Sequence, residues 1–282
     1  MRQSIFAELW FKMARSGSRL NLFIGINVLV FLFIGIIAVS DRFTDGASAE
    51  WLTNQLAMPA WLPSLPYKFW TPITYMFLHR EFFHILFNML WLYWMGRIFE
   101  EYLKPEQFTF TYIAGGLAGA LFYLIAYNVF PAFSVHAQNS VILGASASVN
   151  AVVVAVATLL PDYTIMLLFF GAVRLKYLAL TFVIIDFLGI AASNPGGSLA
   201  HLGGALLGFI FIKQLQKGND WSKIFKREKK LRIVRNQRSG PPANRLPDQE
   251  IIDEILDKIS KSGYESLSSK EKQQLFNASK KE

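Results

Sequence analysis

Four polar side chains interrupt otherwise apolar stretches of the sequence, and their types suit acyl transfer. Ser146 carries a hydroxyl that can attack a carbonyl carbon, and His201 carries an imidazole that can accept the hydroxyl proton. His84 and Asn88 are four residues apart, so in a helix they share one face and offer donors to a developing oxyanion. A helix that begins at Ser146 would add its backbone N–H, because the first N–H groups of a helix lack partners within it.

The stretches that hold these residues are long enough to cross a membrane. The chain has 282 residues, of which 53% are hydrophobic, and it contains no cysteine. Disulfides, thiolate nucleophiles and cysteine-bound metals are therefore excluded. A helix needs about 20 apolar residues to span a bilayer. We expect an all-α polytopic membrane protein in which six segments span the membrane: residues 20–39, 82–98, 108–130, 144–160, 177–192 and 199–215.

Two stretches between these segments are not expected to span. Residues 40–81 mix acidic side chains with tryptophan and proline, which is typical of a structured loop at the membrane interface. Residues 165–175 are apolar, but this stretch is too short to cross a bilayer as a helix. We interpret the shorter stretch as a re-entrant or interfacial loop.

The basic residues indicate how the six segments are oriented. The formal net charge is +8, but Lys and Arg gather at the two ends, which favours membrane orientation over nucleic-acid binding. Four precede the first segment and eleven lie within residues 213–245, whereas the loops after the third and fifth segments have none. By the positive-inside rule both termini face the cytoplasm. His84, Asn88, Ser146 and His201 then lie at one depth, just below the outer surface.

The sequence divides into four parts by charge and hydropathy. Residues 1–19 form a basic cytoplasmic segment, and residues 20–216 form the six-helix membrane domain. Residues 217–246 are a basic juxtamembrane linker, expected to lie on anionic headgroups. Residues 247–282 have isoleucines at helical spacing before Gly263, and a second short helical pattern after it. We interpret this tail as a small cytoplasmic helical hairpin that makes contacts rather than performing chemistry.

Three short motifs resemble the signature motifs of the rhomboid family of intramembrane proteases. They are HILFN at residues 84–88, GAS at 144–146 and AHLGG at 200–204, the last followed by Gly208. The FLH triplet at residues 77–79 and the turn at 96–100 also resemble the family. The likeness extends over about residues 20–215 in the family's order and spacing. Together the motifs are therefore much more specific than a GxS triplet alone.

The resemblance implies a fold, an activity and a set of site residues. The implied fold is a six-helix bundle with a water-accessible cavity that opens to the outer side of the cell (inner) membrane. The implied activity is cleavage of transmembrane-anchored protein substrates by a Ser–His dyad that requires no acid and no cofactor. Ser146 would be the nucleophile and His201 the base. Asn88, His84 and the backbone N–H of Ser146 would form the oxyanion hole.

Three positions depart from the family's pattern. The glycine that usually follows the serine is Ala147, which adds a methyl group where helices pack closely. The aromatic residue often found four positions after the serine, where it can stack on the histidine, is Asn150. The Trp-Arg pair common in the first loop reads Trp70-Thr71. Asn150 in place of an aromatic residue is expected to affect the orientation of His201, and therefore the activity rather than the fold.

Other polar residues in or near the spans have structural interpretations. His79 precedes the second segment and is interpreted as structural. Asp186, in the fifth segment, is interpreted as a hydrogen-bonded structural acid rather than a third member of the catalytic group. Metal binding by His79, His84 and His201 is an alternative, but no carboxylate or HExxH spacing supports it.

Two further classes of function are consistent with parts of the pattern. A non-catalytic rhomboid-like protein would bind transmembrane helices in the lipid bilayer and guide their fate, but inactive relatives typically lack the serine or the histidine, and both are present here. A transporter would be expected to show a pair of interrupted helices as inverted repeats, and none stands out in the sequence. The residues give no indication of oligomeric state.

Overall fold

Helices make up most of the protein, and one lies in each apolar segment that the sequence predicts to span. In the part of the chain that the structure describes, these are α2 (Arg19–Thr44), α5 (Phe82–Tyr102), α6 (Pro105–Val129), α8 (Ser146–Leu159), α9 (Leu175–Gly189) and α10 (Pro195–Gln216). Three of the described helices, α2, α6 and α10, are long and apolar enough to cross a membrane, and α8 is a shorter apolar helix.

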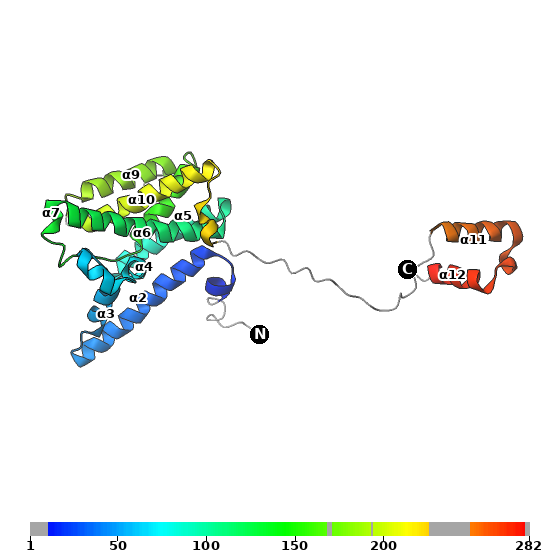
Figure 1. The fold of residues 1–282 in the computed structure, drawn as a ribbon, viewed down its shortest axis with the longest axis horizontal. Helices are drawn as coiled ribbons and strands as arrows, with labels where there is room; N and C mark the ends of the chain where they lie inside the picture. Colours follow the sequence, from blue (N-terminus) through cyan, green and yellow to red (C-terminus); the bar gives the residue numbers. More distant parts are fainter. Residues whose placement is uncertain (1–10, 168–170, 193, 226–248, 280–282) are drawn as a thin grey trace. The chain divides into compact units, whose positions relative to one another are not determined.

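The computed structural model describes residues 11–167, 171–192, 194–225 and 249–279 (Figure 1). The chain separates into two compact units, Met1–Arg227 and Glu228–Glu282. All six apolar helices belong to the first unit. Most of the predicted basic linker, residues 217–246, lies outside the described residues.

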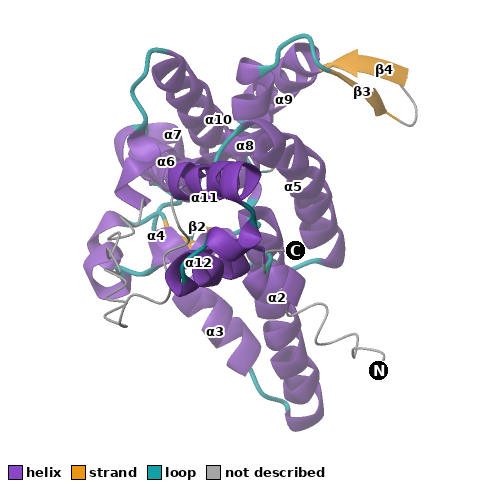
Figure 2. Cartoon of the chain, turned by 90° about the vertical axis from the view of Figure 1, so that its right-hand side faces the viewer, coloured by secondary structure: helices purple, strands orange, loops and turns teal. Residues whose placement is uncertain are grey.

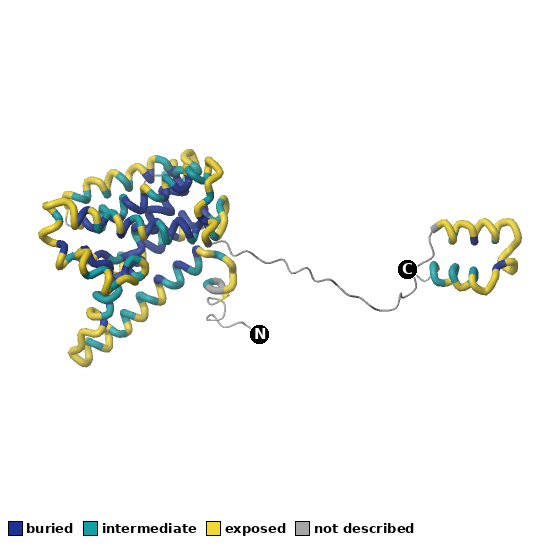
Figure 3. Tube along the Cα trace, in the orientation of Figure 1, coloured by how far each residue is buried: buried dark blue, intermediate teal, exposed yellow. Residues whose placement is uncertain are grey.

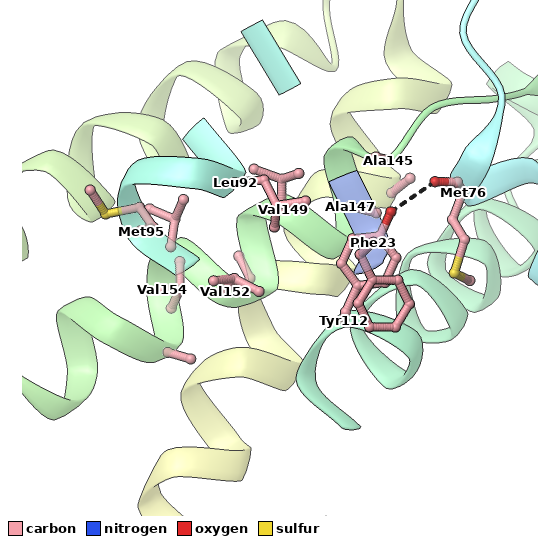
Figure 4. Close-up of a cluster of buried hydrophobic side chains, with 14 of the residues drawn as sticks. Phe23, Met76, Leu92, Met95, Tyr112, Ala145, Ala147, Val149, Val152 and Val154 are labelled. Atoms are coloured by element: carbon pink, nitrogen blue, oxygen red, sulfur yellow. Dashed lines mark hydrogen bonds between the residues drawn. The ribbon is translucent and has the colours of Figure 1, made fainter. Parts of the chain in front are cut away.

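Helix α8 forms the core of the first unit (Figure 2). Every residue from Ala147 to Ala157 is buried, because this stretch consists mostly of alanine and valine and the helix is enclosed by α5, α6, α9 and α10. Its side chains Val149 and Val152 belong to the same buried hydrophobic cluster as Leu92 of α5 (Figure 4). Helix α2, by contrast, is exposed along much of its length (Figure 3), as expected of a helix whose outer face meets lipid.

Small residues let α10 approach α8 closely. Gly204 and Gly208 of α10 pack against the backbone carbonyls of Ala147 and Ala151, with no room for a side chain at either glycine. Helices in a bilayer gain little from hydrophobic burial against lipid, so close van der Waals packing at small residues drives their association. This contact sets the distance between the N-terminal halves of the two helices.

Helix α2 is attached to the bundle through polar groups at two levels. Ser18 caps its N-terminus, and the carboxylate of Glu100 at the end of α5 accepts hydrogen bonds from the Ser18 hydroxyl and the Leu20 N–H. Deeper in the bundle, the Asn27 amide donates to the Tyr112 hydroxyl, which itself donates to the backbone carbonyl of Met76 (Figure 4). These hydrogen bonds join α2 to α6 and to the segment before α5.

The segment between α2 and α5 is folded, as expected of a structured loop. It contains α3 (Ser48–Leu56), a 3-10 helix (Leu62–Lys68) and the short α4 (Thr71–Thr74). Its strand β1 (Met58–Pro59) pairs antiparallel with β2 (Val141–Ile142), just before α8. The short helix α7 (Pro131–Ser134) follows α6.

The all-α prediction needs a small correction, because two pairs of short strands are present among the described residues. Within residues 165–175, predicted to form a re-entrant or interfacial loop, the described residues 165–167 and 171–174 lie in two paired antiparallel strands (Figure 2). Strand β3 (Thr164–Leu167) pairs with β4 (Gly171–Arg174), and α9 follows directly. The pairing satisfies backbone hydrogen bonds that an irregular apolar loop would leave without partners.

The second unit is a pair of helices at the positions that the sequence predicts. Helix α11 (Gln249–Ser262) ends before Gly263, whose φ of 78° is a left-handed conformation that glycine adopts readily, and α12 (Ser269–Ser279) follows. Ile255 and Leu267 are buried within this unit, and Lys258 of α11 pairs with Glu271 of α12.

Candidate active site

The hydroxyl of Ser146 and the imidazole of His201 meet between α8 and α10. Oγ of Ser146 lies 2.6 Å from Nε2 of His201, within hydrogen-bonding distance. Ser146 is the first residue of α8, and His201 lies in the second turn of α10, so the close packing of these helices brings the two side chains together. In this arrangement the imidazole nitrogen can accept the hydroxyl proton, as a general base must.

The chain leading into Ser146 is held by hydrogen bonds to the segment before α5. The N–H of Gly144 donates to the carbonyl of Tyr75 at 2.9 Å. The N–H of Ala145 donates to Nε2 of His79 at 3.4 Å. Together with the β1–β2 pairing, these contacts fix the backbone immediately before the serine.

His79 has the structural position that the sequence predicts. Its side chain is buried, and burial together with the neighbouring His84 lowers the pKa of His79 from its ordinary 6.5 to about 3. The ring is therefore neutral at physiological pH, which leaves Nε2 able to accept the hydrogen bond from the Ala145 N–H. His79 thus supports the loop that carries Ser146.

His84 and Asn88, both on α5, line the same cavity as Ser146 and His201. The cavity has a volume of about 520 Å³, and polar side chains of Arg80, Glu81 and Asn194 also line it. Gly144 has a φ of 129°, and a Cβ on it would lie 2.8 Å from the His84 ring, so the loop passes the histidine as only glycine allows. Nδ2 of Asn88 donates to the His84 carbonyl at 2.8 Å.

Asp186 of α9 also belongs to this cluster, although its position in the sequence predicted only a structural role. Its Oδ1 lies 2.7 Å from Nδ1 of His201, the ring nitrogen that faces away from Ser146. Its Oδ2 accepts a hydrogen bond of 3.0 Å from Nδ2 of Asn150, one turn after Ser146 on α8. The available signal was a lone carboxylate in an apolar run, which is costly without a partner.

The described residues contain no group of three or more His, Asp and Glu side chains that could hold a metal ion. His79 and His84 do lie edge to face, with ring centroids 4.9 Å apart. However, Nε2 of His79 accepts the Ala145 N–H and Nε2 of His201 faces the Ser146 hydroxyl. His79 and His201 are thus engaged in separate hydrogen bonds.

Comparison with known proteins identifies the class to which this fold and site belong. The family model of the Rhomboid domain matches residues 66–217, more than half of the chain. The chain therefore belongs to the rhomboid family. The match includes α5, α6, α8, α9 and α10, and thus every residue of the cluster around Ser146.

One curated relative, "RHOMBOID-like protein 12, mitochondrial" of Arabidopsis thaliana, is 35% identical to this chain over 158 residues. The aligned region is 52% of this chain and 47% of the relative, so the chain spans about half the length of the curated relative that it matches. A second family model, described as a family of unknown function (DUF6576), matches residues 243–281 and so includes α11 and α12.

Proposed function

We propose that this protein is an intramembrane serine endopeptidase that hydrolyses peptide bonds in or near the transmembrane segments of membrane proteins. The observation that carries the proposal is the 2.6 Å approach of the Ser146 hydroxyl to Nε2 of His201 inside the cavity. Membership of the rhomboid family supports the same reaction class.

In the proposed reaction Ser146 is the nucleophile and His201 the general base. As Oγ of Ser146 attacks the scissile carbonyl carbon, its proton passes to Nε2 of His201, and a tetrahedral oxyanion forms. When this intermediate collapses, the C–N bond breaks and His201 returns the proton to the leaving amine. Water then attacks the acyl-enzyme, again giving its proton to His201, and releases the new carboxyl end together with the Ser146 hydroxyl.

Three donors around the cavity are proposed to stabilise the oxyanion: Asn88, His84 and the backbone N–H of Ser146. The position of Ser146 at the start of α8 leaves its N–H without a helical partner and adds the positive end of the helix dipole. The Asn88 amide has two donor hydrogens, so its bond to the His84 carbonyl leaves one for the substrate.

The length of α8 supports a site within the membrane thickness. Its 14 residues extend about 21 Å as a helix, which is less than the roughly 30 Å of the hydrocarbon core. With six spans and both termini cytoplasmic, Ser146 would lie below the outer surface. Arg80, Glu81 and Asn194 would then give water a polar route to it from outside. The bilayer would be the cell (inner) membrane, with residues 247–282 on its cytoplasmic side.

A fluorophosphonate probe, which reacts with activated serine hydroxyls, tests this function directly. We expect the purified full-length protein in lipid to be labelled at Ser146, and the Ser146→Ala and His201→Ala variants to remain unlabelled. Ser148→Ala is the matched control, because Ser148 lies two residues away but is fully buried against Met76. Labelling that persists in Ser146→Ala, or an unlabelled wild-type protein, would contradict the proposal and favour a non-catalytic role.

The proposed reaction also limits which peptide bonds of a transmembrane substrate can be cleaved. A peptide bond within an intact helix has its carbonyl hydrogen-bonded and shielded, so the substrate must unwind locally to reach Ser146. We therefore expect cleavage where small or helix-breaking residues weaken a transmembrane helix. Cleavage of a model substrate scanned with glycine and leucine near the scissile bond measures this preference; equal rates for both would contradict it.

A further inference from the structure

A chain of hydrogen bonds extends beyond the Ser146–His201 pair and crosses three helices. Asp186 of α9 contacts Nδ1 of His201 at 2.7 Å through one carboxylate oxygen. Its other oxygen accepts the amide of Asn150 at 3.0 Å. The Asp186 side chain is 13% exposed and that of His201 is 25% exposed. The carboxylate is therefore largely buried, and each of its oxygens has a hydrogen-bond partner.

This contact determines which imidazole nitrogen can act on the serine. For Nε2 of His201 to accept the Ser146 proton, the other ring proton must reside on Nδ1. A carboxylate at Nδ1 accepts that proton in a hydrogen bond and so favours the required tautomer. After proton transfer, the same carboxylate stabilises the positively charged ring, because a hydrogen bond between charged partners is stronger than one between neutral groups.

Asn150 gives the carboxylate a fixed direction. It lies four residues after Ser146 on α8 and therefore on the same helix face. From there its amide holds Oδ2 of Asp186 while Oδ1 faces His201. The aromatic residue that could stack on the histidine from this position is absent, and the amide–carboxylate pair occupies its place.

We propose that Asp186, held by Asn150, is a positioning residue that orients His201 and stabilises its protonated form. The proposal rests on the serine protease function proposed above. In a purely structural alternative, the hydrogen bond of Asp186 to His201 serves only to hold α9 against α10. The two roles differ in what is lost on substitution: a positioning residue affects turnover, whereas a tie between helices affects stability.

The test measures kcat and KM for a transmembrane substrate, the fluorophosphonate labelling rate and Tm, with the full-length protein in lipid. We expect Asp186→Asn to lower kcat and the labelling rate roughly ten- to a hundredfold, as the loss of a charge-assisted hydrogen bond to the base predicts, with KM little changed. Asp186→Glu, which keeps the carboxylate, should retain more activity than Asp186→Asn. Formate added to Asp186→Ala should raise kcat without raising Tm.

Two further variants separate positioning from general effects. Asp162→Asn is the matched control, because Asp162 pairs with Arg174 and Lys176 at the opposite end of α9; its kcat should equal that of wild type. Asn150→Ala should lower kcat less than Asp186→Asn, because the carboxylate remains.

The outcomes distinguish failure of this proposal from failure of the proposed function. A wild-type kcat in Asp186→Asn would overturn the positioning role. So would a loss of kcat that parallels the loss of Tm, is equal in Asp186→Glu and is not reversed by formate in Asp186→Ala. In either case the wild-type protein would still be labelled at Ser146. A wild-type protein that never reacts with the probe would overturn both.

Discussion

Gly204 of α10 packs directly against the backbone carbonyl of Ala147 in α8. His201 lies one turn before Gly204, and Ser146 lies one residue before Ala147. The two helices therefore approach each other closely at the level of the two groups proposed to react. A backbone carbonyl cannot rotate away as a flexible side chain can, so the spacing between Ser146 and His201 depends on the missing side chain at position 204.

The first prediction follows from this contact. We expect Gly204→Ala to reduce stability by about 1–3 kcal/mol, because the added methyl group would overlap the Ala147 carbonyl and force the helices apart. The measurement is thermal unfolding in detergent, combined with probe labelling of Ser146. Gly35→Ala in α2 is the matched control, since a Cβ there would meet nothing within 4 Å; equal losses in the two variants would contradict the prediction.

The second prediction concerns the Asn88 amide. We expect Asn88→Ala to lower kcat by about 10²–10³, the usual effect of removing one oxyanion donor, with little change in KM. Steady-state cleavage of a transmembrane substrate measures both constants. The control is Asn219→Ala. Asn219 follows α10 and donates a hydrogen bond to the side chain of Gln214, so its removal should change neither kcat nor KM. A rise in KM at unchanged kcat would instead place Asn88 in substrate binding.

The third prediction is a dependence of stability on pH that originates at His79. The folded pKa of about 3 lies below the ordinary 6.5, so between these values the unfolded chain binds more protons than the folded one. The contribution of His79 to stability is therefore complete above pH 6.5 and is lost as the pH falls towards 3. We expect the Tm of wild type to fall more steeply between pH 7 and pH 4 than that of His79→Gln. Parallel curves would refute the assignment.

The fourth prediction concerns the second unit. All residues proposed to act in the site lie within Met1–Arg227, and α11 and α12 form a separate unit. We expect a chain that ends at Arg227 to keep the labelling rate of Ser146 and the kcat of the full-length protein within about twofold, since a change of that size is only about 0.4 kcal/mol in barrier height. A tenfold loss would assign the tail a role in catalysis or in the integrity of the membrane unit.

The sequence predicted much of the site because its residues are polar groups in places where polarity is costly. His84, Asn88, Ser146 and His201 lie in apolar runs, and their places in those runs, combined with the charge distribution, predicted a common depth. The structure brings all four to one cavity. Asp186 also interrupts an apolar run, but its partner depends on the rotation of α9 about its axis, and an apolar helix without a clear polar face does not encode that rotation.

The strand pairs show a different limit. Residues 165–175 are apolar without a clear period, so their sequence does not distinguish a loop from a hairpin, and the β3–β4 pairing emerges only in three dimensions. Likewise, the polar residues from Ser40 onward suggested that the first helix ends at Val39, yet α2 continues to Thr44. Asp41 lies within that extension and accepts the N–H of Ala49 at the start of α3.

Helix α9 is buried unevenly along its length, and this affects the part of the site that it carries. The buried residues of this helix, Leu175, Leu178 and Ala179, all lie near its beginning, whereas Phe187 and Leu188 beside Asp186 are mostly exposed. The carboxylate that contacts His201 is thus carried by the end of α9 whose neighbouring apolar side chains are least buried in the protein. We therefore expect lipid contacts at this end of α9 to change the orientation of the His201 ring before they disturb the buried helix α8 that carries Ser146.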